Sequence, residues 1–317
     1  MGAFFHAVAV FFHHLAEVRW DALALALACQ LAKLAFRSLA WRAILKAAFP
    51  GVKLRLRTAF GAYVAGVGVN SVVPARGGDA VKLYLVKQRL PEASYATLAP
   101  TLAVETLFDA VVAGGLLIWA LSLGVLPTKQ VYARIPTVDW SFLFRHERPA
   151  LAVLGLLAAG LVAGFVWARR RWRRFRAHVA QGFAILGDRG RFVRGVIVPQ
   201  AISWVFRLGG LYFFLEAFGV RATLHNALLA QVVDSLATLF PATPGGAGTK
   251  QGLIVYVFRH QAVSASLLLA FSVGMNIALV VENLVLGLIC IALMARTVSF
   301  RNLRARSRTA EEQATAR

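Results

Sequence analysis

Two proline- and glycine-rich segments carry residues of the types that bind anions. The first reads Pro-Ala-Arg-Gly-Gly-Asp at residues 74–79, and the second reads Pro-Gly-Gly-Ala-Gly-Thr-Lys at residues 244–250. The start of a helix presents unpaired N–H groups, and a neighbouring arginine or lysine adds positive charge, so both segments suit a phosphate. The predicted substrate-binding residues are Arg76, Gly77, Gly78, Asp79, Gly245, Gly246, Gly248 and Lys250.

A structural interpretation of the same segments stays open. Proline cannot continue a helix, so each segment should break one helix and begin the next, with Asp79 as the N-cap of a helix that starts near Ala80. The glycines would then serve only the close packing of the two arms. Arg76 would serve only as the partner of an acid.

Charged side chains also lie inside long apolar runs, where each costs roughly 2.5–3.5 kcal/mol at the membrane centre. Glu105 and Asp109 are one helical turn apart and share a helix face, so both can pair with Arg37, Arg42 or Arg76. These groups would either exchange partners as the protein changes conformation or form permanent ion pairs, and both interpretations stay open. The predicted charge network comprises Arg37, Arg42, Glu105, Asp109, Arg207 and Glu282.

The sequence lacks the motifs of soluble catalysis. It contains no G-x-S-x-G nucleophile motif, no P-loop and no dinucleotide-binding fingerprint. His13 and His14 are adjacent and point to different faces of a helix, which favours an interfacial helix over a metal site. Cys29 and Cys290 each lie in an apolar run, so we expect neither a disulfide framework nor a zinc site. We therefore expect no enzyme activity, no metal and no cofactor.

Apolar helices must position these residues. Only 15% of the 317 residues are charged, against roughly 25% in soluble domains, and the mean hydropathy is +0.65. The composition therefore predicts an all-α integral membrane protein. Residues 3–16 would either cross the membrane or lie at its interface. A crossing takes about 20 residues of helix, which is available at residues 22–45, 95–123, 149–168, 195–218 and 265–294.

Two further segments, residues 59–90 and 224–260, have apolar arms on either side of the proline- and glycine-rich breaks. Each arm has about 14–18 residues, fewer than a full crossing takes. We predict that each segment enters and leaves the membrane on one side as a re-entrant helix pair, which is tolerated only when it is buried in protein. The fold would then contain about 5–6 full spans and two re-entrant pairs.

Basic residues gather beside the apolar runs. The net charge is +21, with arginine clusters at residues 169–176 and 296–308. Because each cluster adjoins a span, the positive-inside rule and anionic lipid headgroups explain it better than nucleic acid does. If both clusters are cytoplasmic, the first re-entrant pair opens from the cytoplasm and the second from the outside.

The chain also resembles itself when it is displaced by 170 residues, since Arg37 then falls on Arg207 and Pro74 on Pro244. Inverted repeats with interrupted helices form many secondary transporters, whose binding site lies between the halves. We therefore predict a single transmembrane domain, residues 1–295, followed by a basic cytoplasmic tail at 296–317. The domain would comprise repeat one (20–123), a linking span (149–168) and repeat two (195–294).

At these residues the chain resembles the flippase-like family, also described as the transmembrane region of lysylphosphatidylglycerol synthases. The family usually carries a glutamate shortly after the last glycine of the second break. This chain has Thr249-Lys250-Gln251 there, so no acidic role is carried over to that point. The resemblance rests on Trp41-Arg42, residues 74–79, Glu105 through Asp109, and residues 241–248.

This resemblance implies a lipid translocase that moves an anionic or glycosylated lipid between leaflets, such as a phospholipid or an isoprenoid- or hopanoid-linked lipid. Synthase members carry a soluble aminoacyl-transfer domain after the membrane part, where this chain has only residues 296–317, so we expect no transferase activity. The Ala- and Arg-rich composition suggests a bacterial inner membrane, with the C-terminus in the cytoplasm. Two alternatives are a membrane-embedded lipid-modifying enzyme and a non-transporting partner of a lipid or glycan biosynthetic enzyme.

Overall fold

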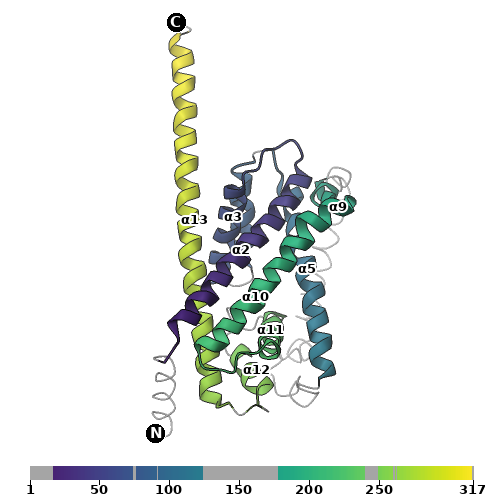
Figure 1. Ribbon diagram of the computed structural model, residues 1–317. Coiled ribbons are helices and arrows are strands. Elements are labelled where there is room, and N and C mark those ends of the chain that lie inside the picture. Colours follow the sequence, from purple (N-terminus) through teal and green to yellow (C-terminus); the bar gives the residue numbers. More distant parts are fainter. Residues whose placement is uncertain are drawn as a thin grey trace, which may run out of the picture.

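In the computed structural model, the regular structure of the described residues is entirely helical (Figure 1). The expected span 149–168, the segment 3–16 and the centre of the second break, including Gly245, Gly246 and Gly248, lie outside the described residues. The prediction of an all-α fold is confirmed for the part of the chain that is described. The structure describes residues 17–73, 76–90, 92–123, 178–239, 249–259, 261 and 263–315.

Four helical stretches are long and apolar enough to cross a membrane, and they match four of the five expected spans. The third begins with the short helix α9 (Arg189–Phe192) and a π-helical turn that lead into α10. The fourth, α13, continues past its apolar part, so the expected tail extends this helix away from the body of the protein (Figure 1). The four stretches are α2 (Trp20–Ala48), α5 (Tyr95–Ser122), α9 with α10 (Val198–Ala217), and residues Ala265–Ala295 of α13 (Ala265–Thr315).

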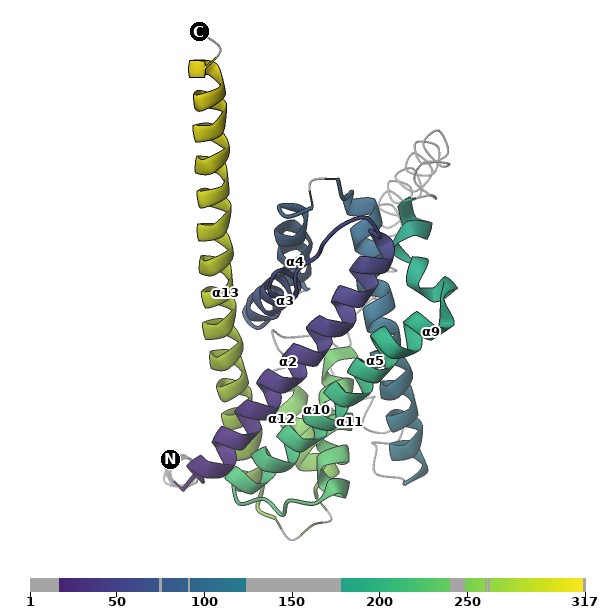
Figure 2. The same ribbon diagram turned by 45° about the horizontal axis from the view of Figure 1, so that its top comes forward.

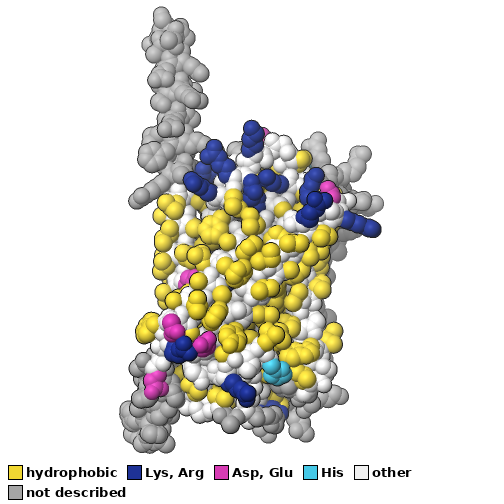
Figure 3. Space-filling view, in the orientation of Figure 1, with side chains coloured by type: hydrophobic (Ala, Val, Ile, Leu, Met, Phe, Trp, Pro, Cys, Tyr) yellow, Lys and Arg dark blue, Asp and Glu magenta, His cyan; other side chains and the backbone are white. Residues whose placement is uncertain are grey.

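The surface has the polarity of a membrane protein. Figure 3 shows hydrophobic side chains over the middle of the visible face, and Lys and Arg gathered at the end from which α13 projects. Lys53, Arg55 and Arg57, which precede or begin the first short helix, are exposed. Large apolar side chains of the long helices are exposed, such as Val111 and Ile118 on α5. Exposed apolar side chains are expected where a membrane-spanning helix faces lipid.

Four shorter helices form the two expected interrupted pairs. They are too short to span the hydrocarbon core, because the longest would extend about 24 Å against about 30 Å. The first pair packs arm against arm, as does the second, and the two pairs lie toward opposite ends of the molecule (Figures 1 and 2). The pairs are α3 (Leu56–Asn70) with α4 (Gly77–Lys87), and α11 (Leu224–Leu239) with α12 (Thr249–Val257).

The helix bounds recur at the expected interval. α5 begins at Tyr95 and α13 at Ala265, 170 residues later, and α4 ends at Lys87 while α12 ends at Val257. The related helices α2 and α10 pack along each other, and the related Phe36 and Phe206 stack with ring centroids 5.6 Å apart. Equivalent residues touch only near the axis that relates two repeats. The order and contacts of the helices therefore agree with a repeat, whose inverted orientation stays a prediction.

Each broken pair packs on a long helix of the other half: α3 packs on α13, and α11 packs on α5. At the first crossing the backbones nearly touch: a Cβ on Gly68 would lie 2.6 Å from the Asn283 carbonyl oxygen and 2.8 Å from Cα of Gly287. At the second crossing the repeat puts Leu117 at the position of Gly287, and Leu117 lines a cavity. Leu117 also packs against the buried Ala120, Val232 and Leu236, so side chains separate the helices at the second crossing, whereas backbones meet at the first.

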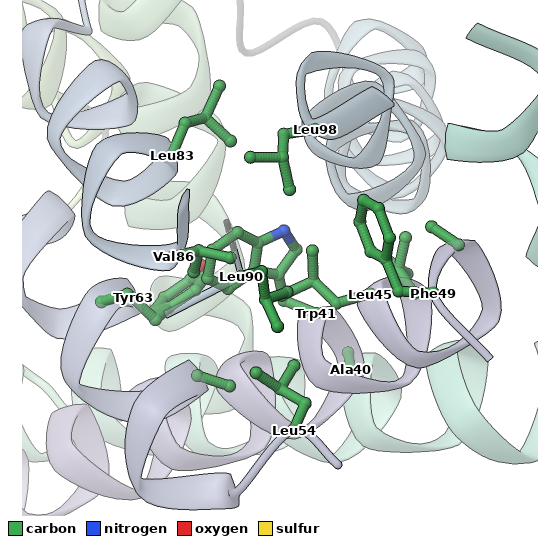
Figure 4. Packing of buried hydrophobic residues seen from close by; sticks show 14 of the residues in the cluster. Ala40, Trp41, Leu45, Phe49, Leu54, Tyr63, Leu83, Val86, Leu90 and Leu98 are labelled. Carbon is green, nitrogen blue, oxygen red and sulfur yellow. The ribbon is translucent and has the colours of Figure 1, made fainter. Parts of the chain in front are cut away.

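Buried apolar residues form two large clusters and a small third one, in which Ala120 of α5 packs with Val232 and Leu236 of α11. The first surrounds Trp41, which packs with Tyr63 and Leu98 from α3 and α5 (Figure 4). Trp41 Nε1 donates to Thr101 Oγ1 at 3.2 Å, so the buried indole N–H is satisfied. The second cluster joins the start of α2 to α10, α11, α12 and α13. These two cores hold the broken pairs against the long helices.

Candidate functional site

The first break has a strained backbone and an unusual cap. Arg76 has φ 59° in the left-handed region, where it is the one non-glycine residue in the described part of the chain. Such a conformation costs roughly 1–2 kcal/mol, so the surroundings must impose it. α4 begins at Gly77, earlier than a cap at Asp79 would place it. Asn70, at the end of α3, instead accepts from the Gly78 N–H at 2.7 Å and donates to Asp79 at 3.2 Å.

The glycines of this break have a packing role. A Cβ on Gly78 would overlap the Gly66 carbonyl oxygen, and a Cβ on Gly77 would lie 2.6 Å from a Val73 methyl carbon. The Gly78 N–H is already bonded to Asn70, and the Asp79 N–H to the Arg76 carbonyl. An anion at this break would therefore be bound by the Arg76 side chain rather than by these two amides.

A cavity of about 740 Å³ lies beside the break, between α5, α10 and α11. The Arg76 side chain is exposed there and makes no ion pair or hydrogen bond with any described residue. Arg207, Asp109 and Trp204 supply the other large polar groups, and the remaining wall is mostly apolar. The volume is typical of a ligand-binding site. The rest of the lining comprises Ala103, Thr106, Leu107, Ala110, Ala113, Gly114, Leu117, Val232, Ser235 and Leu236.

The first charge cluster joins α2, α3, α4 and α5. Arg37 Nη2 donates to Asp109 at 2.5 Å and to Glu105 at 3.1 Å, while its Nε donates to Tyr63 Oη at 2.6 Å. Lys82 Nζ donates to the other Glu105 oxygen at 2.5 Å and lies 4.3 Å and 4.0 Å from the ring centroids of Trp41 and Tyr63. Two cations thus meet two carboxylates, and the cluster is electrically balanced.

The second charge cluster has the same plan with other residues. Arg207 Nε donates to Gln231 Oε1 at 2.6 Å, and Arg207 Nη2 donates to Asp234 Oδ2 at 2.9 Å. Lys250 Nζ donates to Asp234 Oδ1 at 2.6 Å. In both clusters an arginine of a long helix, Arg37 or Arg207, contacts the first arm of a broken pair. In both, a lysine of the second arm, Lys82 or Lys250, contacts an acid.

Trp204 connects the two clusters. Its Nε1 donates to Asp109 Oδ1 at 2.9 Å, and the Arg207 guanidinium lies 4.9 Å from the ring centroid. Asp109 also pairs with Arg37 of the first cluster. A continuous chain of hydrogen bonds, ion pairs and one cation–π contact therefore connects Lys82 on α4 to Lys250 on α12. Both Trp204 and Arg207 line the 740 Å³ cavity, so an occupant of the cavity would contact the link between the two halves.

A family model described as the lysylphosphatidylglycerol synthase TM region matches residues 3–287. The chain belongs to this family. No curated protein and no solved structure matches the chain. Membership supports a lipid-related function in the membrane and is compatible with the expected absence of enzyme activity, because the family's membrane region lacks the catalytic transfer domain.

The matched region of this lysylphosphatidylglycerol synthase family member contains every site residue predicted from sequence. Arg37, Glu105 and Asp109 come together as expected, but Arg42 donates to the Leu54 carbonyl oxygen at 3.0 Å instead of joining them. Glu282 lies apart, with a buried Oε2 that has no hydrogen bond in the described part of the chain. Among described residues, no group of three or more His, Cys, Asp or Glu side chains could hold a metal.

Sequence reasoning missed several polar partners in this family member. Tyr63, Lys82, Gln231 and Trp204 complete the two clusters, and only their contacts in the fold identify them. Lys33 was also missed, although it lies in the expected span 22–45. The rule that singled out Arg37, namely a charge inside an apolar run, would have found it.

Proposed function

We propose that this protein moves an anionic or glycosylated lipid between the leaflets, with the headgroup in the 740 Å³ cavity. The observation that carries the proposal is the pair Arg76 and Arg207, which line one mostly apolar cavity while the Arg76 guanidinium has no partner among the described residues. A guanidinium binds phosphate oxygens in a bidentate manner and loses less hydration energy than an ammonium does. A phospholipid or an isoprenoid- or hopanoid-linked lipid would supply the phosphate.

The remaining wall of the cavity suits lipid chains. α5 contributes small residues on the cavity side, including Ala110, Ala113 and Gly114. A Cβ on Gly114 would meet nothing within 4 Å, so this helix face leaves free space. The headgroup would bind near the arginines while the tails remain in lipid beside α5.

Alternating access is the mechanism that the two helix crossings support. The α3–α13 crossing is closed by Gly68 and Gly287, whereas the equivalent α11–α5 crossing borders the cavity. If the two crossings exchange these states, the cavity opens toward the other face while the headgroup stays near the middle. The re-entrant course of the two broken pairs is part of this proposal.

The distribution of charge supports an orientation. Lys53, Arg55 and Arg57 are exposed, and Figure 3 shows Lys and Arg gathered at the end from which the C-terminal part of α13 projects. By the positive-inside rule, this end and the C-terminus lie in the cytoplasm of a bacterium, where the basic residues contact anionic headgroups of the inner membrane.

Reconstitution in liposomes with labelled phosphatidylglycerol tests the function. We expect Arg76→Gln to slow lipid movement by roughly 10- to 100-fold, the worth of one charge-assisted hydrogen bond. Arg57→Gln, which changes an exposed arginine outside the cavity, is the matched control and should leave the rate unchanged. Equal rates for the wild type and Arg76→Gln would overturn the headgroup site.

A second pair of variants tests the cavity itself. Gly114→Phe should block lipid movement because the ring fills the cavity, whereas a ring at neighbouring Gly115, which does not line the cavity and meets nothing within 4 Å, should not. Conversion of the headgroup in the same liposomes would favour a lipid-modifying enzyme. Neither movement nor conversion would favour a non-transporting partner of another enzyme.

A further inference from the structure

A second, smaller cavity of about 60 Å³ lies among α2, α10, α11, α12 and α13. It is separate from the headgroup cavity, and Arg207 is the one residue that lines both. The apolar part of its wall comes from Phe206, Met275 and other side chains of these helices. Its polar lining comprises Gln30, Lys33, Arg207, Gln231, Asp234 and Lys250.

The charges around this cavity do not balance. Three cations, Lys33, Arg207 and Lys250, face one carboxylate, Asp234. Lys250 and Arg207 already donate to the two oxygens of Asp234. The Lys33 ammonium makes no hydrogen bond or ion pair with any residue that the structure describes. A partly buried ammonium beside two other cations is unfavourable at low dielectric, so an anion in the cavity would stabilise its charged form.

Glu282, an acid with an electrostatic effect on Lys33, does not pair with it. Glu282 on α13 is close enough for an electrostatic interaction with Lys33, but the two form no ion pair within 4 Å, and Glu282 does not line the cavity. The side chains beside them instead bond to each other, because Gln30 Nε2 donates to Asn283 Oδ1 at 2.8 Å. This bond holds α2 against α13 and leaves the Lys33 ammonium at the cavity.

We propose that the small cavity binds one small anion, with Lys33 as its principal ligand and Arg207 and Lys250 beside it. A water molecule occupies about 30 Å³ in the liquid, so a cavity of about 60 Å³ accepts chloride or a single carboxylate or phosphate group. The bound anion neutralises Lys33 and fixes the position of Arg207, the residue shared with the larger cavity. This anion site can be present whether or not the protein transports lipid.

Thermal unfolding of the detergent-solubilised protein tests this site. Chloride titrated against isethionate at constant ionic strength should raise the melting temperature saturably. Lys33→Met should weaken the apparent chloride affinity by roughly 10- to 100-fold, because it removes a hydrogen bond to a charged group. Lys33→Arg, which keeps the charge, should retain most of it. Lys87→Met, at another partly buried lysine outside the cavity, is the matched control.

Two sources of the anion give different results in this experiment. If the anion is free in solution, chloride or inorganic phosphate stabilises the wild type and Lys33→Arg. If it belongs to a lipid, phosphatidylglycerol in mixed micelles stabilises them and the free anions do not. A response of Lys33→Met equal to that of the wild type in both titrations, or no response of the wild type in either, would overturn the proposal. Lipid movement in Arg76→Gln liposomes is a separate readout, so the two proposals can fail independently.

Discussion

Two helix crossings that the 170-residue repeat makes equivalent differ in how tightly they close. α3 meets α13 at Gly68 and Gly287, where no side chain separates the backbones. α11 meets α5 at the edge of the 740 Å³ cavity, with Leu117 in place of the second glycine. Related halves therefore hold different conformations at corresponding positions. This asymmetry supports the proposed alternating access, because an exchange of the two unlike states would move the cavity from one face to the other.

The two charge clusters show a second difference between the halves. In the first cluster, Arg37 and Lys82 meet two carboxylates, so the charges balance without a ligand. In the second, Asp234 faces three cations, including Lys33. The repeat puts the neutral Ser203 at the position that corresponds to Lys33. A balanced cluster can serve as a permanent ion-pair lattice, whereas the unbalanced cluster is the one at which we propose a bound anion.

The largest expected effect comes from removing the lone carboxylate of the second cluster. Asp234→Asn leaves both Arg207 and Lys250 without an acid among their described partners. Because this leaves the buried Lys250 ammonium uncompensated, we expect a loss of about 3–5 kcal/mol in the free energy of unfolding. Titration with SDS in mixed micelles measures it.

Glu105→Gln in the first cluster is the matched comparison for that variant. It strands Lys82 alone, since Arg37 keeps its bond to Asp109. Its loss in the free energy of unfolding should therefore be smaller than that of Asp234→Asn. An equal or larger loss would contradict the view that the second cluster depends on a single acid.

A smaller effect is expected at the closed crossing. Gly68→Ala inserts a Cβ against the Asn283 carbonyl oxygen and Gly287, and backbone atoms cannot yield as a flexible side chain does. Overpacking of this kind costs about 1–3 kcal/mol. Unfolding in detergent measures the loss, and Gly115→Ala, whose Cβ would meet nothing within 4 Å, is the control. If Gly68→Ala and Gly115→Ala were equally stable, the α3–α13 crossing would accept a Cβ at Gly68 and would not be tightly closed.

The order of the helices could be predicted from the sequence because few forces decide it. Apolar runs longer than about 20 residues identified four spans found in the structure. Proline and glycine marked the first break between α3 and α4. The spacing of Glu105 and Asp109 on one face, together with the cost of a lone charge in the membrane, indicated that they would pair with an arginine, but left Arg37, Arg42 and Arg76 open, of which the structure shows Arg37.

Partners that depend on depth and on distant packing could not be predicted in this way. Arg42 lies near the end of α2 and donates a hydrogen bond to the Leu54 carbonyl oxygen, so its guanidinium has a partner other than an acid. Lys82 lies between rings that α2 and α3 contribute, and no local spacing reveals this environment. The α4 helix begins at Gly77 because Asn70, from the preceding helix, caps it.

The smallest expected effect tests whether the two clusters are linked through Trp204. Trp204→Phe keeps an aromatic ring beneath Arg207 but removes the indole donor to Asp109. Hydrogen bonds between membrane helices contribute about 0.5–1.5 kcal/mol, so stability in micelles should fall by that amount. The rate of lipid movement should fall by more than this loss of stability alone would cause. The reason is that the lost contact joins the two halves, which must change state together.

A double-mutant cycle with Asp109→Ala separates these two roles of Trp204. If Trp204 acts through Asp109, the double variant should move lipid no more slowly than Asp109→Ala alone. Additive effects on the rate would mean that Trp204 acts on the occupant of the cavity directly. In that case the two clusters would respond to the lipid separately, and the difference between the halves would not be transmitted through this contact.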